Sequence, residues 1–193
     1  MIRFSIFAIF AAVFFAAGQD VSGQSTPALG EAQRYTGDRF TVAGRTARGA
    51  NVYGVKRPSV GMLNAIDRGL TDLFAIARRH GYRSKLNYAD YSIYIGRADR
   101  QTNAAGEYSP DIAVGSAQYT GSIYDKGGYI YVAGMVIANE PASFIIGEHT
   151  RDFNRVAEVV RFEGEHLILY HNDRRRYMAT RDHSQGGGHP ILQ

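Results

Sequence analysis

Apolar residues recur every three or four positions in two long stretches of the chain, a spacing that predicts amphipathic helices. The first helix is expected to begin at Pro58–Ser59 and to end near His80, because Gly81 stands where helices commonly stop. Its apolar positions are Val60, Leu63, Ile66, Leu70, Leu73, Phe74 and Ala77. Gly69 lies inside this helix at a cost of about 1 kcal/mol relative to alanine, so we expect another element to approach closely there.

The second stretch predicts a long helix with an N-cap at Thr150 or Asp152 and an end near Asn172. One apolar stripe comprises Phe153, Val156, Ala157, Val160, Gly164, Leu167, Ile168 and His171, and the opposite side carries Val159, Phe162 and Leu169. A helix that is apolar on more than one face is usually enclosed within its domain. We therefore expect a buried C-terminal helix, approached closely by another element at Gly164, and a shorter helix after it over residues 173–181.

Before the first helix and between the two helices, the pattern changes to the alternation typical of strands. The candidate strands are Arg39–Ala43, Asn51–Val55, Tyr91–Ile95, Ile112–Tyr119, Gly121–Tyr124 and Tyr129–Ile137. Ala43–Gly44 predicts a turn between the first two, and Asp125–Gly128 predicts the turn of a β-hairpin between the last two. Pro141 is expected to break the sheet, and Phe144–Ile146 to form a short strand or a loose turn.

This order of elements predicts a single globular α+β domain over residues 38–193. We expect a mainly antiparallel sheet with a β-hairpin, packed against an N-terminal helix and a long buried C-terminal helix. With 45% hydrophobic residues in the whole chain, such a domain can bury a core.

Residues 1–23 have the features of a cleaved signal peptide. A short positive start at Met1–Arg3 precedes the uncharged apolar run Phe4–Ala17, and Ala16 and Gly18 suit a small-residue cleavage site. The run is shorter than the roughly twenty residues that span a bilayer, so no stable membrane span is expected after cleavage. The sequence thus predicts a secreted or periplasmic protein, in which residues 24–37, rich in Gly, Ser, Thr and Gln, form a flexible lead-in.

Composition and motifs exclude several classes of function. The chain has no cysteine, which excludes disulfides, thiolate nucleophiles and thiolate metal ligands. A net charge of +4 is modest and dispersed, so we expect no nucleic-acid partner, but rather a peptide or an anionic envelope polymer. The chain also contains no His-Glu-x-x-His, Gly-x-Ser-x-Gly, P-loop or dinucleotide-binding motif.

Four of the six histidines lie in the last forty residues, where they alternate with carboxylates. Glu163 and His166 are three apart on the expected helix, so their side chains can reach one metal ion or share a proton. His183 and His189 are candidate ligands further along the chain. This set predicts a metal site, with zinc the expected ion, whose open position would turn bound water into a hydrolytic nucleophile.

Glu165 and Tyr170 are the candidate catalytic residues beside these ligands, Tyr170 because it lies four positions after His166. Other interpretations of the same pattern remain open. Glu163 and His166 can simply hydrogen bond to each other within a partly buried helix, or act as a metal-free acid–base pair. The central position of His171 in the apolar stripe favours a core histidine bonded to a backbone carbonyl.

Two functions follow from these observations. The first is a metal-dependent hydrolase, peptidase-like, built on the Glu/His cluster. The second is a non-catalytic binding domain that presents a tyrosine-rich sheet surface, because aromatic rows on a sheet suit glycans or peptides. The tyrosines of that surface would be Tyr91, Tyr94, Tyr119, Tyr124, Tyr129 and Tyr131.

Overall fold

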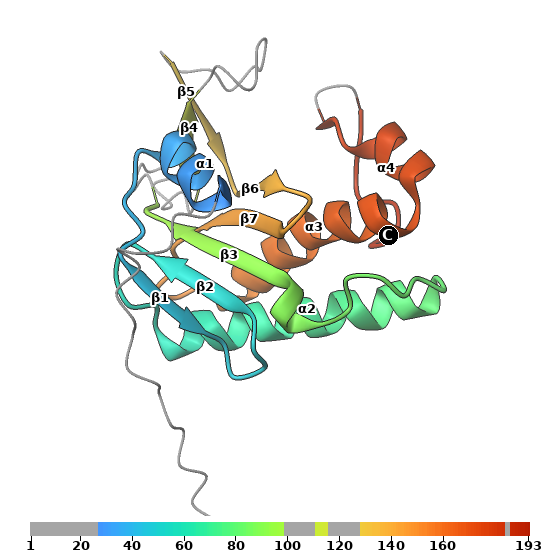
Figure 1. Ribbon diagram of the computed structural model, residues 1–193, viewed down its shortest axis with the longest axis horizontal. Coiled ribbons are helices and arrows are strands. Elements are labelled where there is room, and N and C mark those ends of the chain that lie inside the picture. Colours follow the sequence, from blue (N-terminus) through green and yellow to red (C-terminus); the bar gives the residue numbers. More distant parts are fainter. Residues whose placement is uncertain (1–26, 99–110, 116–127, 184–185) are drawn as a thin grey trace, which may run out of the picture.

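The computed structural model describes residues 27–98, 111–115, 128–183 and 186–193, which fold as an α+β structure in three layers (Figure 1). The helices and strands follow in the order α1 (Pro27–Thr36), β1 (Val42–Arg45), β2 (Asn51–Gly54), α2 (Val60–Arg79), the 3₁₀ turn η2 (Tyr88–Asp90), β3 (Tyr91–Gly96), β4 (Ile112–Gly115), β5 (Tyr129–Val132), β6 (Gly134–Ala138), β7 (Ala142–Gly147), α3 (Phe153–Asn172) and α4 (Arg174–Thr180). The predicted signal peptide, residues 1–23, lies outside the described residues. None of the described helices is long and apolar enough to cross a membrane.

The main sheet has five strands in the order β1-β2-β3-β7-β6. β3 pairs in parallel with both of its neighbours, whereas β1–β2 and β6–β7 are antiparallel, so this sheet is mixed. β2 and β3 can run in parallel because α2 carries the chain back between them. β4 and β5 form a separate antiparallel pair. The α+β class is confirmed.

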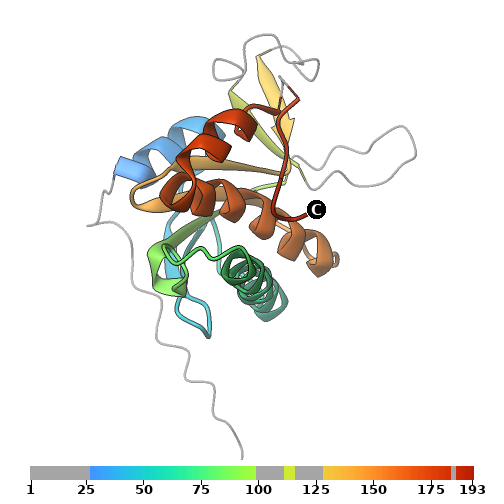
Figure 2. The same cartoon turned by 90° about the vertical axis from the view of Figure 1, so that its right-hand side faces the viewer.

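Two apolar cores lie on opposite faces of the main sheet. The helices that cover these faces can be followed in Figure 2, with α2 and α3 on one side of the sheet and α1 on the other. The larger core joins the sheet to α2 and α3, and the smaller one joins it to α1 and the β4–β5 pair. β3 serves both, because alternate side chains of a strand point to opposite faces. Tyr91, Ile93 and Ile95 face the larger core, and Tyr94 faces the smaller core.

The start of the domain differs from the prediction. The expected flexible lead-in over residues 24–37 is wrong from Pro27 onward, where α1 begins. Ala28, Leu29 and Ala32 lie on one face of α1 and are buried in the smaller core. Three small or apolar side chains at helical spacing are enough to dock this helix, although the surrounding composition is typical of a linker.

Several strand boundaries also differ. The turn expected at Ala43–Gly44 is wrong, because both residues lie in β1 and the chain reverses at residues 46–50 instead. The single strand expected over Tyr129–Ile137 is divided into β5 and β6. The expected hairpin strand Gly121–Tyr124 and residues 125–127 of its turn lie outside the described residues.

The segment around Phe144 forms a full central strand, β7, with every residue buried. Pro141 does not end the sheet but lies in the turn that joins β6 to β7. A strand buried on both faces carries a continuous apolar run instead of an alternation, which is why its length was not evident from the pattern.

The two long helices and their caps are confirmed. Ser59 accepts a hydrogen bond from the Met62 amide at the start of α2, and Asp152 accepts one from the Arg155 amide at the start of α3. The short helix α4 begins in the same way, with Asp173 accepting from the Arg176 amide. These side chains satisfy amide groups that a helix start leaves without intrahelical partners.

α2 and α3 pack closely against each other at the two glycines that the sequence singled out. A β-carbon on Gly69 would lie 2.6 Å from the Ala157 carbonyl oxygen and 2.9 Å from the Val160 side chain, and one on Gly164 would overlap Leu73. Both expected close approaches are therefore confirmed. With the sheet on one side and α4 on another, α3 is enclosed as its apolar faces predicted.

Candidate metal centre

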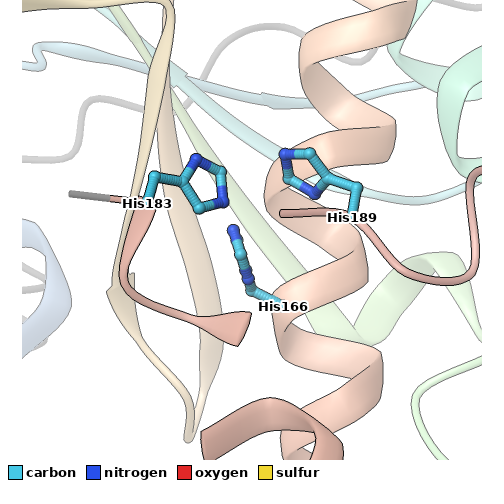
Figure 3. A group of neighbouring side chains, drawn as sticks. All are labelled: His166, His183 and His189. Atoms are coloured by element: carbon cyan, nitrogen blue, oxygen red, sulfur yellow. The ribbon is translucent and has the colours of Figure 1, made fainter. Parts of the chain in front are cut away.

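Three histidines from separate segments meet beside α3. His166 projects from α3, His183 follows α4, and His189 belongs to the C-terminal tail, residues 186–193 (Figure 3). Their candidate ligand nitrogens all lie within 4.8 Å of one another. The ring centres of His166 lie 5.1 Å from His183 and 5.0 Å from His189, and the latter two rings are 4.8 Å apart. The group could hold a metal ion.

The chain reaches this arrangement by reversing direction after α4. The Gly187 amide donates to the Asp182 carbonyl at 3.0 Å, and the Gly186 amide donates to the His183 carbonyl at 3.3 Å. Gly186 has φ +82°, a conformation that glycine adopts without strain. The backbone of Gly187 packs so tightly on residues 180 and 182 that a β-carbon would overlap the Thr180 carbonyl. This glycine turn brings the tail back alongside α3 (Figure 2).

His189 is held in one orientation by two contacts with α3. Its ring stacks on Phe162, with centres 4.5 Å apart and planes 17° from parallel. Its Nδ1 lies 2.7 Å from Oε2 of Glu165. In the tautomer in which Nδ1 donates this hydrogen bond to the carboxylate, Nε2 keeps its lone pair. That is the tautomer in which Nε2 can bind a metal.

His166 is buried, with 8% of its surface exposed. Burial, followed by the neighbouring His189 and His183, lowers its pKa to about 3, so this imidazole is neutral at physiological pH. No described residue hydrogen bonds to its buried Nδ1. Desolvation and the nearby His189 also lower the pKa of the more exposed His183. Neutral imidazoles are the form that binds metals.

The structure places Glu163, the fourth expected ligand, away from the three histidines. Its side chain turns toward β6, where a β-carbon on Gly134 would lie 2.9 Å from its Oε1, and its carboxyl accepts a hydrogen bond from the Val136 backbone. Burial raises the pKa of Glu163 to about 8. Side chains three positions apart on a helix point about 60° apart around its axis. In α3 this angle is enough to put Glu163 against the sheet and His166 against the tail.

The two expected catalytic residues also have other surroundings. Glu165 is fully buried and both of its oxygens accept hydrogen bonds from the tail, so it does not face an open coordination position. Tyr170 packs against Tyr177, with the Arg174 guanidinium 3.6 Å above its ring centre. His171 Nε2 lies 2.8 Å from the Asn139 carbonyl oxygen, which confirms the expected bond to the backbone.

The proposed tyrosine surface is wrong for its two residues on β3. Tyr91 and Tyr94 are both buried, Tyr91 between α2 and β7 and Tyr94 in a stack with Tyr53. Tyr129 on β5 is 53% exposed and Tyr131 is partly exposed. Tyr119 and Tyr124 lie outside the described residues.

The chain matches no protein-family model, and comparisons with curated proteins and with solved structures give no significant match. Three imidazole nitrogens suit zinc and other late first-row ions. Around a tetrahedral zinc with Zn–N bonds of about 2.0–2.1 Å, the ligand nitrogens lie about 3.3 Å apart. The exposed His183 is the ligand with most freedom to draw in.

The sequence pattern indicates the three histidines but not the residues that support them. The stacking of Phe162 on His189 and the hold of Glu165 on the tail depend on where the tail returns. The only signal in the sequence was a carboxylate directly before His166. Helix geometry puts neighbouring residues about 100° apart, so the sequence alone does not indicate that Glu165 and His166 both meet the tail.

Proposed function

We propose that this protein is a zinc-dependent hydrolase in which His166, His183 and His189 hold the ion. The observation that supports this best is the convergence of three imidazoles from α3, the α4 end and the tail, with candidate ligand nitrogens within 4.8 Å. Three histidines leave one position of a tetrahedral zinc free for water, and zinc lowers the pKa of that water to about 7. The resulting hydroxide is the nucleophile.

The expected substrate is a peptide, or an envelope polymer that contains a similar bond, outside the cytoplasm. His183 is the exposed member of the group, so the group is open to solvent on this side, where an extended polymer could approach. A zinc ion held by the three histidines would supply both the activation of a water molecule and the polarisation of a substrate carbonyl. Glu163 has no part in this mechanism because its carboxyl lies against β6.

The first experiment measures zinc in the protein purified without a histidine tag, by elemental mass spectrometry. About one ion per chain is expected for the unmodified protein and for His80→Ala, because His80 lies at the end of α2 with its ring against Tyr82. His166→Ala should lose the ion. A protein that stays free of metal after incubation with zinc contradicts the proposal.

Hydrolysis is tested separately, by incubating a mixture of synthetic peptides with the zinc-loaded protein and following cleavage by mass spectrometry. Cleavage should stop on addition of a chelator, return with zinc and be absent in His183→Ala. If the protein binds one zinc ion per chain but cleaves neither peptides nor purified envelope polymers, the metal site is supported and the proposed hydrolase activity is contradicted.

A further inference from the structure

Glu165 is a carboxylate with no exposed surface, and its two oxygens are used separately. Oε2 lies 2.7 Å from Nδ1 of His189, and Oε1 accepts a hydrogen bond of 2.7 Å from the Ile191 amide. Burying a carboxylate is costly unless its oxygens have partners. Both partners here come from the tail, so Glu165 and the tail satisfy each other.

The tail segment that Glu165 holds is also anchored by apolar contacts. Ile191 is 3% exposed and belongs to the larger core, and the His189 ring lies on Phe162. His189 is therefore held by its own ring and by Ile191, two positions further along the tail. His183, in contrast, is exposed. The group thus consists of two histidines that the fold holds in place, His166 and His189, and a third, His183, that is exposed.

We infer that Glu165 is the positioning residue of the metal centre, and that zinc binding and docking of the tail are therefore one coupled event. This inference rests on the metal site of the proposed function. By accepting the Nδ1 proton of His189, Glu165 keeps the lone pair on Nε2, and by accepting the Ile191 amide it keeps the ring at α3. Carboxylates in this position commonly tune metal affinity as strongly as some ligands do.

The variant Glu165→Gln keeps the shape of the side chain and tests both of its hydrogen bonds, the one to His189 and the one to the Ile191 amide. If the amide oxygen faces His189, the amide NH₂ meets the Ile191 N–H, and two donors oppose each other. If the oxygen faces Ile191, the NH₂ donates to Nδ1 of His189 and the ring proton moves to Nε2, where it blocks the metal. Either orientation weakens the site.

The experiment measures zinc affinity by competition with a chromophoric chelator. Glu165→Gln should bind zinc about 10–100-fold more weakly than the unmodified protein. Glu158→Gln, a carboxylate on the same helix outside the group, should bind as the unmodified protein does. In a His189→Ala background, Glu165→Gln should have almost no further effect, because Glu165 acts through His189. A similar loss in that background, or no loss in the single variant, overturns the inference.

Nitrogen NMR of the metal-free protein separates this inference from the proposed function. His189 should be in the Nδ1-protonated form in the unmodified protein and lose that form in Glu165→Gln. The tautomer and the zinc affinity should change together, whereas a merely structural role of Glu165 would leave the zinc affinity unchanged. An Nε2-protonated His189 in a protein that still binds zinc overturns the role of Glu165 alone, whereas absence of zinc binding overturns both proposals.

Discussion

The contact between α2 and α3 and the contact between α3 and the C-terminal tail use the same helix in opposite ways. Toward α2, α3 presents small and apolar residues, with Gly69 and Gly164 at the points of closest approach. Toward the tail it presents Phe162, Glu165 and His166, which bind by a ring stack and charged hydrogen bonds. The contact between α2 and α3 is expected to stabilise the fold, and the contact between α3 and the tail is expected to position the metal ligands. Changes on one side should therefore leave the other largely intact.

The largest expected effect is on the α2 side. Gly69→Ala puts a β-carbon against the Ala157 carbonyl, a backbone atom that cannot turn away, and should destabilise the fold by about 3 kcal/mol, as overpacking of a tight contact does. Chemical denaturation measures this. Gly30→Ala in α1, where a β-carbon meets nothing within 4 Å, is the control and should not destabilise. Equal stability of the two variants would contradict the close contact between α2 and α3.

The next effect is on the tail side. Gly187→Ala would force apart the turn between His183 and His189, since the new β-carbon overlaps the Thr180 carbonyl. Zinc affinity is expected to fall about 10–100-fold, or roughly 1.4–2.8 kcal/mol, while the denaturation midpoint of the metal-free protein changes little. Gly188→Ala has room for its β-carbon and should bind zinc normally. If both variants bind equally, the turn does not set the ligand spacing.

A third effect depends on pH and involves the sheet side of α3. The pKa of Glu163 is raised from 4.5 to about 8, so between these values the folded state holds a proton that the unfolded state has lost. Stability from this group is complete below pH 4.5 and is lost as the pH rises through 8. Glu163→Gln mimics the protonated form and should be more stable than the unmodified protein at pH 9, by about 2 kcal/mol for a partly exposed side chain.

The measurement is thermal or chemical unfolding of the metal-free protein at pH 5 and pH 9. The two proteins should be nearly equal at pH 5 and should diverge at pH 9. Glu158→Gln serves as the control and should follow the unmodified protein at both values. A difference that is the same at pH 5 and pH 9 would show that Glu163 is not protonated in the folded state.

The smallest effect comes from removing helix caps. Asp173→Ala and Asp152→Ala each remove a side chain that accepts an amide at a helix start, at a cost of about 1 kcal/mol. Asp173 caps α4, the helix that leads to His183. Asp173→Ala should therefore also lower zinc affinity, by a few-fold, whereas Asp152→Ala should not. Comparing the two variants by chelator competition tests whether α4 positions the metal site. Equal zinc affinity in the two variants would show that the start of α4 does not position the metal site.

Local rules predicted the parts of the fold that are locally determined. α2 and α3 were identified with their caps because periodicity and N-cap chemistry agree there. β7 was underestimated because both of its faces are buried, and α1 was missed because its residues lie in a linker-like composition. The parallel pairing of β3 with its neighbours depends on where the helices return the chain, which no short window of sequence records.

The site shows the same division between local and tertiary information. The crowding of His166, His183 and His189 near the end of the chain was visible in the sequence, and the fold brings them together. The position of Glu163 is not visible in the sequence. Its side chain faces β6 and not the histidines because of how the sheet packs against α3. Glu165 was expected to assist catalysis, but its hydrogen bonds to His189 and Ile191 arise only when the tail has docked.

The glycine turn between His183 and His189 makes these two ligands a tethered pair. With His189 anchored on α3, His183 is confined to a small volume beside it, and the tether acts as a high local concentration of the third ligand. In the proposed metal site, an ion would be released in steps, because the exposed His183 could leave it while the other two imidazoles still bind. Exchange of zinc with a competing chelator should then proceed through a mixed complex, at a rate that depends on chelator concentration.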